Sequence, residues 1–343
     1  MPYWLALSGV LAGIACQPSG KPQDRATTPD VASDTAAPVS VIFDTDFGPD
    51  YDDVGALALL HALADQGRVR ILATVASNRH PLVAPSIDVL NTYFGRPDLP
   101  IGAPPAGSVN LGAVQYWPDT LVAHYPHAVA STGEVSDAVT LYRRVLSAQP
   151  DTSVIIVSVG FLTNLRDLLQ SAPDSLSPLP GEALVKQKVK QWVAMAGRFP
   201  EGREFNVYTD STAAREAIEH WPTPILFSGF EIGQRVKTGL RLVADGPAES
   251  PVRHAFAISM PLAEEDSAGR MSWDQTATLA AVMSPAPFYR VQRGYFVSQP
   301  DGSNGWRDDP NGPHAYLVEK TAPDSVARVI ESLMMHQPDT NGR

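Results

Sequence analysis

Apolar and polar positions follow two alternating patterns along the chain from about residue 38 onward. Short continuous apolar runs, rich in β-branched residues, are followed by longer stretches in which apolar residues recur every three or four positions. The first pattern is typical of strands buried on both faces, and the second of helices that connect parallel strands. We predict strands at 39–43, 69–76, 152–160, 190–197 and 224–229, and helices at 53–67, 136–148, 163–172 and 211–221.

This alternation predicts an α/β fold with a doubly wound, mainly parallel central sheet, in a single domain over 39–340. The chain has 343 residues, of which 44% are hydrophobic and 18% charged, so it can bury a large core. In such sheets ligands bind beyond the carboxyl ends of the strands. We therefore expect the functional site among the polar residues that follow the predicted strands, which lie at 44–53, 78, 159–164 and 198–206.

The N-terminus begins with a short apolar segment that ends in small residues before Cys16, the only cysteine. A membrane-spanning helix needs about 20 apolar residues, so a cleaved export signal is the better interpretation. The residues before the cysteine resemble a bacterial lipoprotein cleavage site, with an ordinary cleaved signal or a mis-assigned start as alternatives. We expect a signal peptide over 1–16 and a disordered tether over 17–38. The protein would then be exported to the periplasm or outer membrane of a bacterium, and only its N-terminal lipid would contact a membrane.

The net charge of −11 argues against a nucleic acid polymer as partner, because no basic patch stands out that could neutralise phosphates. A nucleoside carries no phosphate and stays compatible with this charge. Small molecules remain possible substrates, and the sequence leaves homo-oligomerisation open. One cysteine cannot form an intramolecular disulfide, so packing or a metal must hold the domain together.

The stretch DTDFGPDYDD, 44–53, crowds carboxylates directly after the first predicted strand. Two like charges repel by about 4 kcal/mol at about 4 Å for an effective dielectric constant of about 20. The loop itself supplies no Lys or Arg, so we expect a divalent cation bound by oxygen ligands, and Ca²⁺ is the favoured ion. The alternative interpretation is that Asp50, Asp52 and Asp53 only cap and flank the following helix in solvent.

This stretch resembles the N-terminal motif of the inosine-uridine-preferring nucleoside hydrolase family, D-x-D-x-G-x-D-D-A-x-A, with a two-residue insertion. Later segments are similar to segments of the same family in the same order: ILATVASN, IIVSVGFLTNL, VAMAGRFPEGREFNVYTDSTAA and MSWDQTATLAAV. The resemblance implies a nucleoside hydrolase-like, Rossmann-like fold with a Ca²⁺ site. It also implies hydrolysis of the N-glycosidic bond of ribonucleosides, which yields ribose and free base.

The resemblance also implies a role for each matching residue. Asp46 becomes the general base and a metal ligand, and the other ligands are Asp53, Asp274 and the carbonyl oxygen of Val159. Asp50 receives no role, because it lies in the insertion. The implied substrate contacts are Asp52, Asn78, Met195, Glu204, Asn206 and Trp273.

Simpler interpretations exist for several of these residues. Asn78 could cap the turn after its strand, and Glu204 with Asn206 could lie in a surface loop. Asp274 could be the N-cap of the last motif's helix, and Met195 could be an ordinary core residue.

The departures from the family pattern concern the end of the site that would hold the nucleobase. Trp273 stands where much of the family has a histidine that is thought to protonate the departing base. An indole is no acid at neutral pH, although it can stack on a base ring. His80 is a candidate acid, and Arg198 and Arg203 stand in a shortened loop where the family commonly has an asparagine for the 5′ hydroxyl.

Two other functions remain as alternatives. Phosphatases of the haloacid dehalogenase type also begin with a strand and D-x-D and bind Mg²⁺, but they normally have Thr or Val where Gly48 stands, and they do not need the Asp52–Asp53 pair. The second alternative is a lipoprotein that binds ribose or a nucleoside without hydrolysing it, or with a different specificity.

Overall fold

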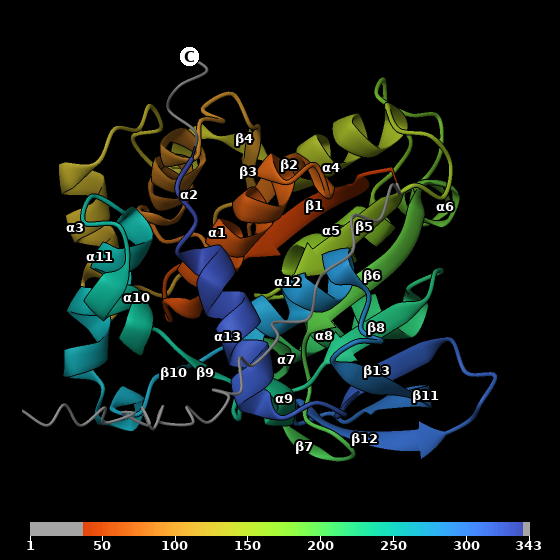
Figure 1. The fold of residues 1–343 in the computed structure, drawn as a ribbon. Coiled ribbons are helices and arrows are strands. Elements are labelled where there is room, and N and C mark those ends of the chain that lie inside the picture. The colour runs from red at the N-terminus through yellow and green to blue at the C-terminus, as the bar shows by residue number, and fades with distance from the viewer. Residues whose placement is uncertain (1–36, 339–343) are drawn as a thin grey trace, which may run out of the picture. The chain divides into compact units, whose positions relative to one another are not determined.

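The computed structural model describes residues 37–338. The predicted signal peptide, 1–16, and nearly all of the predicted tether, 17–38, lie outside the described residues. One large sheet runs through the described part of the chain in the order β4-β3-β2-β1-β5-β6-β8-β13-β11-β12-β7 (Figure 1). Its strands are β1 (Val39–Thr45), β2 (Val69–Ala76), β3 (Ile101–Ala103), β4 (Ser136–Asp137), β5 (Val154–Ser158), β6 (Val189–Met195), β7 (Gly202–Arg203), β8 (Ile225–Ser228), β11 (Tyr289–Ser298), β12 (Ser303–Asp308) and β13 (His314–Glu319).

Helices cover the sheet, and a separate pair of short antiparallel strands, β9 (Lys237–Thr238) and β10 (Arg270–Met271), lies outside it. The helices are α1 (Asp52–Asp65), α2 (Val83–Tyr93), α3 (Trp117–His124), α4 (Ala138–Ser147), α5 (Thr163–Gln170), α6 (Gly181–Lys188), α7 (Phe205–Thr209), α8 (Ser211–His220), α9 (Phe230–Gly233), α10 (Leu240–Asp245), α11 (Pro251–Ser259), α12 (Trp273–Met283) and α13 (Pro323–Met334). No helix among residues 37–338 combines the length and apolar character needed to cross a bilayer.

Counted in the order in which they lie in the sheet, the strands from β4 to β13 run parallel to one another, which confirms the predicted fold class. The first described strand, β1, lies inside the sheet and pairs with β2 on one side and β5 on the other. All of β1 after its first residue is buried, as expected for a continuous apolar run between two parallel neighbours. The predicted strands and helices all form, with ends shifted by a few residues.

The far edge of the sheet differs from the prediction. β11 runs antiparallel to β13, and β12 and β7 continue this antiparallel extension. β11 mixes buried and exposed positions along its length because one face is partly solvated, so the sequence shows no continuous apolar run there.

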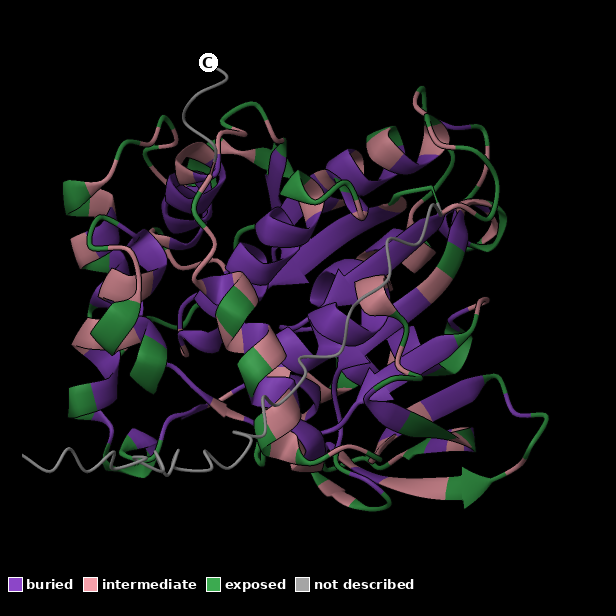
Figure 2. Ribbon diagram, viewed as in Figure 1, coloured by how far each residue is buried: buried purple, intermediate pink, exposed green. Residues whose placement is uncertain are grey.

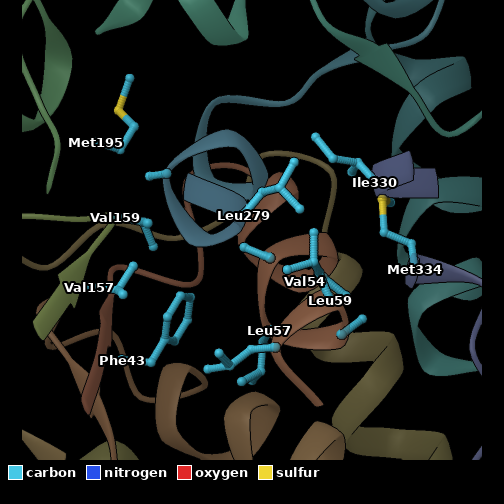
Figure 3. Close-up of a cluster of buried hydrophobic side chains, with 14 of the residues drawn as sticks. Phe43, Val54, Leu57, Leu59, Val157, Val159, Met195, Leu279, Ile330 and Met334 are labelled. Carbon is cyan, nitrogen blue, oxygen red and sulfur yellow. The ribbon is translucent and has the colours of Figure 1, made fainter. Parts of the chain in front are cut away.

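Two buried hydrophobic clusters lie on the opposite faces of the sheet. Val41 and Phe43 of β1 contribute to the first cluster, and Ile42 between them contributes to the second. The first cluster also holds side chains of α1, α2, α11, α12 and α13, and the second those of α4, α5, α6 and α8. Figure 2 shows the resulting buried centre, and Figure 3 shows the first cluster around α1.

Helix α1 occupies the centre of the first cluster, because every residue from Asp52 to Leu63 is buried. Helices α12 and α13 both pack against it. A methyl group added at Gly55 would lie 2.5 Å from the Gln275 amide nitrogen, so this glycine lets α1 and α12 approach closely. The close approach brings the acidic first turns of the two helices together, although they come from opposite ends of the domain.

Candidate active site

A pocket of about 90 Å³ opens where several parallel strands end, as the fold class predicts. Its floor continues the first hydrophobic cluster, because Val159 after β5 and Met195 at the end of β6 belong to both (Figure 3). The walls come from the β1–α1 loop and from the first residues of α7, α9 and α12. The lining residues are Asp46, Asp50, Asp52, Asp53, Val159, Met195, Glu204, Phe205, Asn206, Phe230, Trp273 and Asp274.

Most residues that the sequence analysis singled out meet in this pocket. Asp46 follows β1, and Asp274 lies in the first turn of α12, more than two hundred residues later in the chain. Both are almost fully buried. Of the metal ligands and substrate contacts that the resemblance implied, Asn78 alone does not line the pocket.

Three carboxylates form the tightest acidic group. One oxygen each of Asp52, Asp53 and Asp274 lies within 4.8 Å of the others. Asp53 accepts hydrogen bonds from the Thr45 hydroxyl and from the Phe47 N–H at 3.2 Å. Since Asp52 and Asp53 are each only 1% exposed, the interpretation of these two as solvent-exposed helix caps is wrong.

The simpler interpretation of Asp274 is also wrong. Helix α12 begins at Trp273, so the N-cap position belongs to Ser272, and Asp274 is in the first turn. The Asp274 carboxylate is therefore not the N-cap of α12. The positive end of the α12 dipole favours a negative charge at this position.

Burial and mutual repulsion raise the pKa values of the pocket carboxylates. Burial raises the pKa of Asp53 to about 7, and the charge of Asp52 adds to this effect. The pKa values of Asp46 and Asp274 also rise well above their ordinary range, first through burial and then through neighbouring carboxylates. A cluster of this kind binds protons near neutral pH unless a cation takes their place.

Arg270 provides a counter-charge that the sequence analysis missed. Its guanidinium donates to the Asp52 carboxylate at 2.9 Å and lies 2.9 Å from the Asp50 carboxylate. The sequence analysis looked for a cation only within the β1–α1 loop, whereas Arg270 reaches Asp52 across 218 positions of sequence. One arginine does not balance the five aspartates that line the pocket, so the remaining negative charge still fits a divalent cation.

The available oxygen atoms fit a metal that prefers hard ligands. Asp46, Asp53 and Asp274 present carboxylates to the same pocket, and the backbone of Val159 borders it. The Val159 carbonyl accepts a hydrogen bond from the Asn206 amide at 3.2 Å, and its second lone pair remains for a cation. Asp46 is not one of the three clustered carboxylates, Asp52, Asp53 and Asp274. This cluster therefore shares only Asp53 and Asp274 with the metal ligands that the resemblance implies.

Glu204 and Asn206 are built into the pocket wall rather than into a surface loop. The Glu204 carboxylate caps α7 by accepting from the N–H groups of Asn206 at 2.7 Å and Val207 at 3.2 Å. It also accepts from Gly197 at 3.0 Å. Burial raises the pKa of Glu204 to about 7, although these backbone hydrogen bonds act in the opposite direction. The surface-loop interpretation of these two residues is therefore wrong.

Asn78 holds the loops around the pocket together. Its amide nitrogen donates to the carbonyls of Asp46 at 3.0 Å and Leu111 at 2.7 Å. Its amide oxygen accepts from the N–H groups of Leu111 at 3.0 Å and His80 at 3.2 Å. These bonds fix the backbone of Asp46, and the substrate contact of Asn78 stays a prediction. His80, the candidate acid, does not line the pocket.

Two aromatic residues that line the pocket, Trp273 and Phe230, pack against each other. The Trp273 indole N–H donates to the Phe230 carbonyl at 2.8 Å, and the two ring centres lie 5.1 Å apart. The sequence analysis missed Phe230, although it follows β8 at the carboxyl end of the sheet, where the same rule would have found it. The Arg198 guanidinium lies 5.5 Å from the centre of the Phe230 ring. Arg203 instead packs over Tyr208 and donates to the Asp301 carbonyl.

Residues 41–298 match the family model described as inosine-uridine preferring nucleoside hydrolase. The chain belongs to this family. No curated protein sequence matches the chain. Family membership accounts for the order of motifs and for the acidic pocket, and it removes the phosphatase alternative. It also supports a metal-dependent hydrolase that acts on nucleosides.

Solved structures with the same fold include enzymes and bacterial effectors. A purine-preferring ribonucleoside hydrolase from Gardnerella vaginalis has a TM-score of 0.68 at 15% identity, covering 86% of this chain and 98% of that one. A plant nucleoside hydrolase has a TM-score of 0.64 at 20% identity, covering 87% and 99%. The type III effector XopQ, solved with adenosine diphosphate ribose, has a TM-score of 0.65 at 15% identity, covering 87% and 94%. At these identities the likeness shows the fold alone.

The β5–α5 turn provides the first test of how the site is held. A methyl group added at Gly160 would lie 2.4 Å from both the Asp46 backbone nitrogen and the Ser77 hydroxyl. We expect Gly160→Ala to destabilise the protein by about 1–3 kcal/mol, because the backbone beside Asp46 must move. Urea unfolding measures this change. Gly133→Ala is the control, because its methyl meets no atom closer than 3.6 Å. Equal losses in both variants would contradict the assignment.

Proposed function

We propose that this protein hydrolyses the N-glycosidic bond of ribonucleosides, giving ribose and free base, with Ca²⁺ in the acidic pocket. The observation that carries the proposal is that Asp46 and Asp274, from opposite ends of the domain, line one buried pocket. Membership of the nucleoside hydrolase family supports the same reaction. The oxygen-rich lining supports calcium over softer metals.

Asp46, Asp53, Asp274 and the Val159 carbonyl would hold the ion. When bound, calcium would act as a Lewis acid that acidifies a water molecule and orients the sugar hydroxyls. The pocket residues provide negative charge and exclude bulk solvent, since Asp46 and Asp274 are each 5% exposed.

Asp46 is the proposed general base. Water attacks the anomeric carbon of ribose while the bond from that carbon to the base nitrogen breaks, and the bonding electrons leave with the base. Asp46 accepts the proton that the attacking water loses. In the metal-free pocket, burial and the nearby carboxylates raise the pKa of Asp46, and a bound cation would counteract this rise and keep Asp46 ionised.

Polar side chains that line the pocket would hold the sugar. We assign the ribose hydroxyls to Asp52, Glu204 and Asn206, which present carboxylate and amide groups to the pocket. Met195 provides an apolar surface beneath the ring, and Asn78 fixes the Asp46 backbone. The transition state develops positive charge on the sugar, and the surrounding carboxylates stabilise it.

Trp273 and Phe230 would stack on the departing base. Neither ring can donate a proton to the base nitrogen at neutral pH, and no histidine lines the pocket. This observation favours a second candidate function, in which the protein binds ribose or a nucleoside without hydrolysing it or acts on a different riboside. Chromatographic detection of released base, beside calorimetric binding of the same nucleoside, separates the two functions.

Export remains a proposal that rests on the sequence around Cys16. A lipid attached to this cysteine would anchor the domain to a membrane in the periplasm or at the outer membrane. We also leave homo-oligomerisation as an open proposal.

The proposed base is tested by Asp46→Ala. We expect this variant to lose at least about 100-fold in kcat/KM for nucleoside hydrolysis, because a positioned base contributes about 10²- to 10⁴-fold. Its affinity for calcium should also fall, because a ligand is removed. Released base is measured by chromatography, with the exposed Asp98→Ala as control. Wild-type turnover by Asp46→Ala would rule out the assignment.

The proposed stacking role is tested by Trp273→Ala. We expect binding of nucleosides to weaken by about 5- to 100-fold, since stacking on one aromatic residue contributes about 1–3 kcal/mol per base. Binding of free ribose should change little, and Trp273→Phe should keep most of the nucleoside affinity. Calorimetry measures both ligands. An equal loss for ribose and nucleoside would contradict the stacking role.

The raised pKa values predict opposite effects of pH with and without metal. The pKa of Asp53 is about 7 in the fold and 3.8 in a free chain, so the metal-free folded state binds the extra proton. This group therefore stabilises the metal-free protein more as pH falls from about 7 toward about 4. Calcium needs the ionised form, so the gain in Tm from added calcium over chelator should shrink from about pH 8 to about pH 5. A gain in Tm that is independent of pH would contradict the calcium site.

A further inference from the structure

Arg270 is not among the residues that line the pocket, and its guanidinium contacts three acidic residues. Its guanidinium reaches Asp52 at the start of α1, Asp50 in the inserted part of the loop, and Asp266 at 3.6 Å. The side chain is 5% exposed. Because Asp50 is 48% exposed, the Asp52 contact is the better shielded of the two shorter ion pairs.

Aromatic rings hold the guanidinium in place. Its central carbon lies 4.8 Å from the centre of the Tyr51 ring and 5.1 Å from that of Trp273. The Tyr51 hydroxyl donates to Asp266, which also faces Arg270. Tyr51, like Asp50, belongs to the inserted segment, so the insertion supplies part of the enclosure around Arg270.

Both carboxylate oxygens of Asp52 already accept hydrogen bonds from the protein. Oδ1 accepts from Arg270 at 2.9 Å, and Oδ2 accepts from the backbone N–H of Asp274 at 3.2 Å. By contrast, no side-chain donor among residues 37–338 bonds to the carboxylate of Asp274, and the charges around it are aspartates. The two acids therefore differ in how much negative charge remains for a cation.

The positions of Asp52 and Asp274 alone would not show which of them binds the cation. Asp52 lies within the same 4.8 Å group as Asp53 and Asp274, so its distance suits a third carboxylate ligand. Asp46 is outside this group. A cation placed by carboxylate spacing alone would then use Asp52 and sit away from the proposed base.

We propose that Arg270 is a positioning residue that withholds Asp52 from the cation and reserves it for a sugar hydroxyl. This inference rests on the proposed calcium-dependent function. The ion pair lowers the negative charge that Asp52 offers to a cation and fixes the orientation of its carboxylate. Asp46, Asp53 and Asp274 would then hold the cation, beside the proposed base. The carboxylate of Asp52 still has lone pairs that can accept from a hydroxyl.

The test measures calcium affinity by calorimetry in a double-mutant cycle of Arg270→Met and Asp52→Asn. In the wild-type background, Asp52→Asn should weaken calcium binding by about 10-fold or less, through the loss of a nearby charge alone, whereas Asp53→Asn should weaken it by at least about 100-fold, because it also removes a ligand. Arg270→Met should bind calcium about 10-fold more tightly, because Asp52 becomes free to bind it. Asp52→Asn in the Arg270→Met background should abolish this gain.

The second measurement is binding of ribose to the calcium-saturated proteins. Arg270→Met should weaken ribose binding by about 10-fold or more, because Asp52 has turned to the cation, and Arg270→Lys should restore part of it. Arg307→Met removes the same charge from an exposed arginine packed over Tyr295 and controls for net charge. It should leave both affinities unchanged.

The contradicting outcomes distinguish failure of the Arg270 inference from failure of the proposed calcium-dependent function. If wild-type protein binds calcium and Asp52→Asn weakens it as strongly as Asp53→Asn, then Asp52 is already a ligand and this inference is overturned, while the calcium site survives. If wild-type protein binds no divalent cation, the proposed function fails with it. Should Arg270→Met not fold, as shown by circular dichroism, Arg270→Gln takes its place in the cycle, because it also removes the charge but keeps a polar side chain.

Discussion

Repulsion among buried carboxylates is the constraint on which the rest of the site depends. The close approach of α1 and α12 brings Asp52, Asp53 and Asp274 into one group, and burial makes each of their charges costly. Helix N-termini and the guanidinium of Arg270 offset part of this repulsion, and Arg270 reduces the negative charge without cancelling it. The remaining negative charge is what makes a divalent cation the natural occupant of the pocket.

The fold places this charge where catalysis needs it. A parallel sheet collects residues from distant parts of the chain at one edge, and Val159 and Met195 of the first hydrophobic cluster (Figure 3) also line the pocket. Gly160 and Asn78 then fix the backbone of Asp46 from two sides. The position of the proposed base is thus determined by close packing and hydrogen bonds around its backbone.

The sequence predicted the parts of the molecule that depend on local patterns. Continuous apolar runs identified the central parallel strands, and the motifs after them identified nearly all of the residues that line the pocket. Contacts over long sequence distances could not be predicted in this way: Arg270 reaches Asp52 across 218 positions, and Asn78 acts through backbone carbonyls that no sequence motif reveals. The antiparallel edge was missed because β11 mixes buried and exposed residues.

The most direct test of the account is a crystal structure of the protein soaked with calcium and ribose. The account predicts a calcium ion bonded to the carboxylates of Asp46, Asp53 and Asp274 at about 2.3–2.6 Å, with the sugar hydroxyls completing its coordination. It also predicts Asp52 in contact with ribose and with Arg270. A calcium ion that leaves Asp46 uncoordinated, or a sugar bound elsewhere on the molecule, would contradict it.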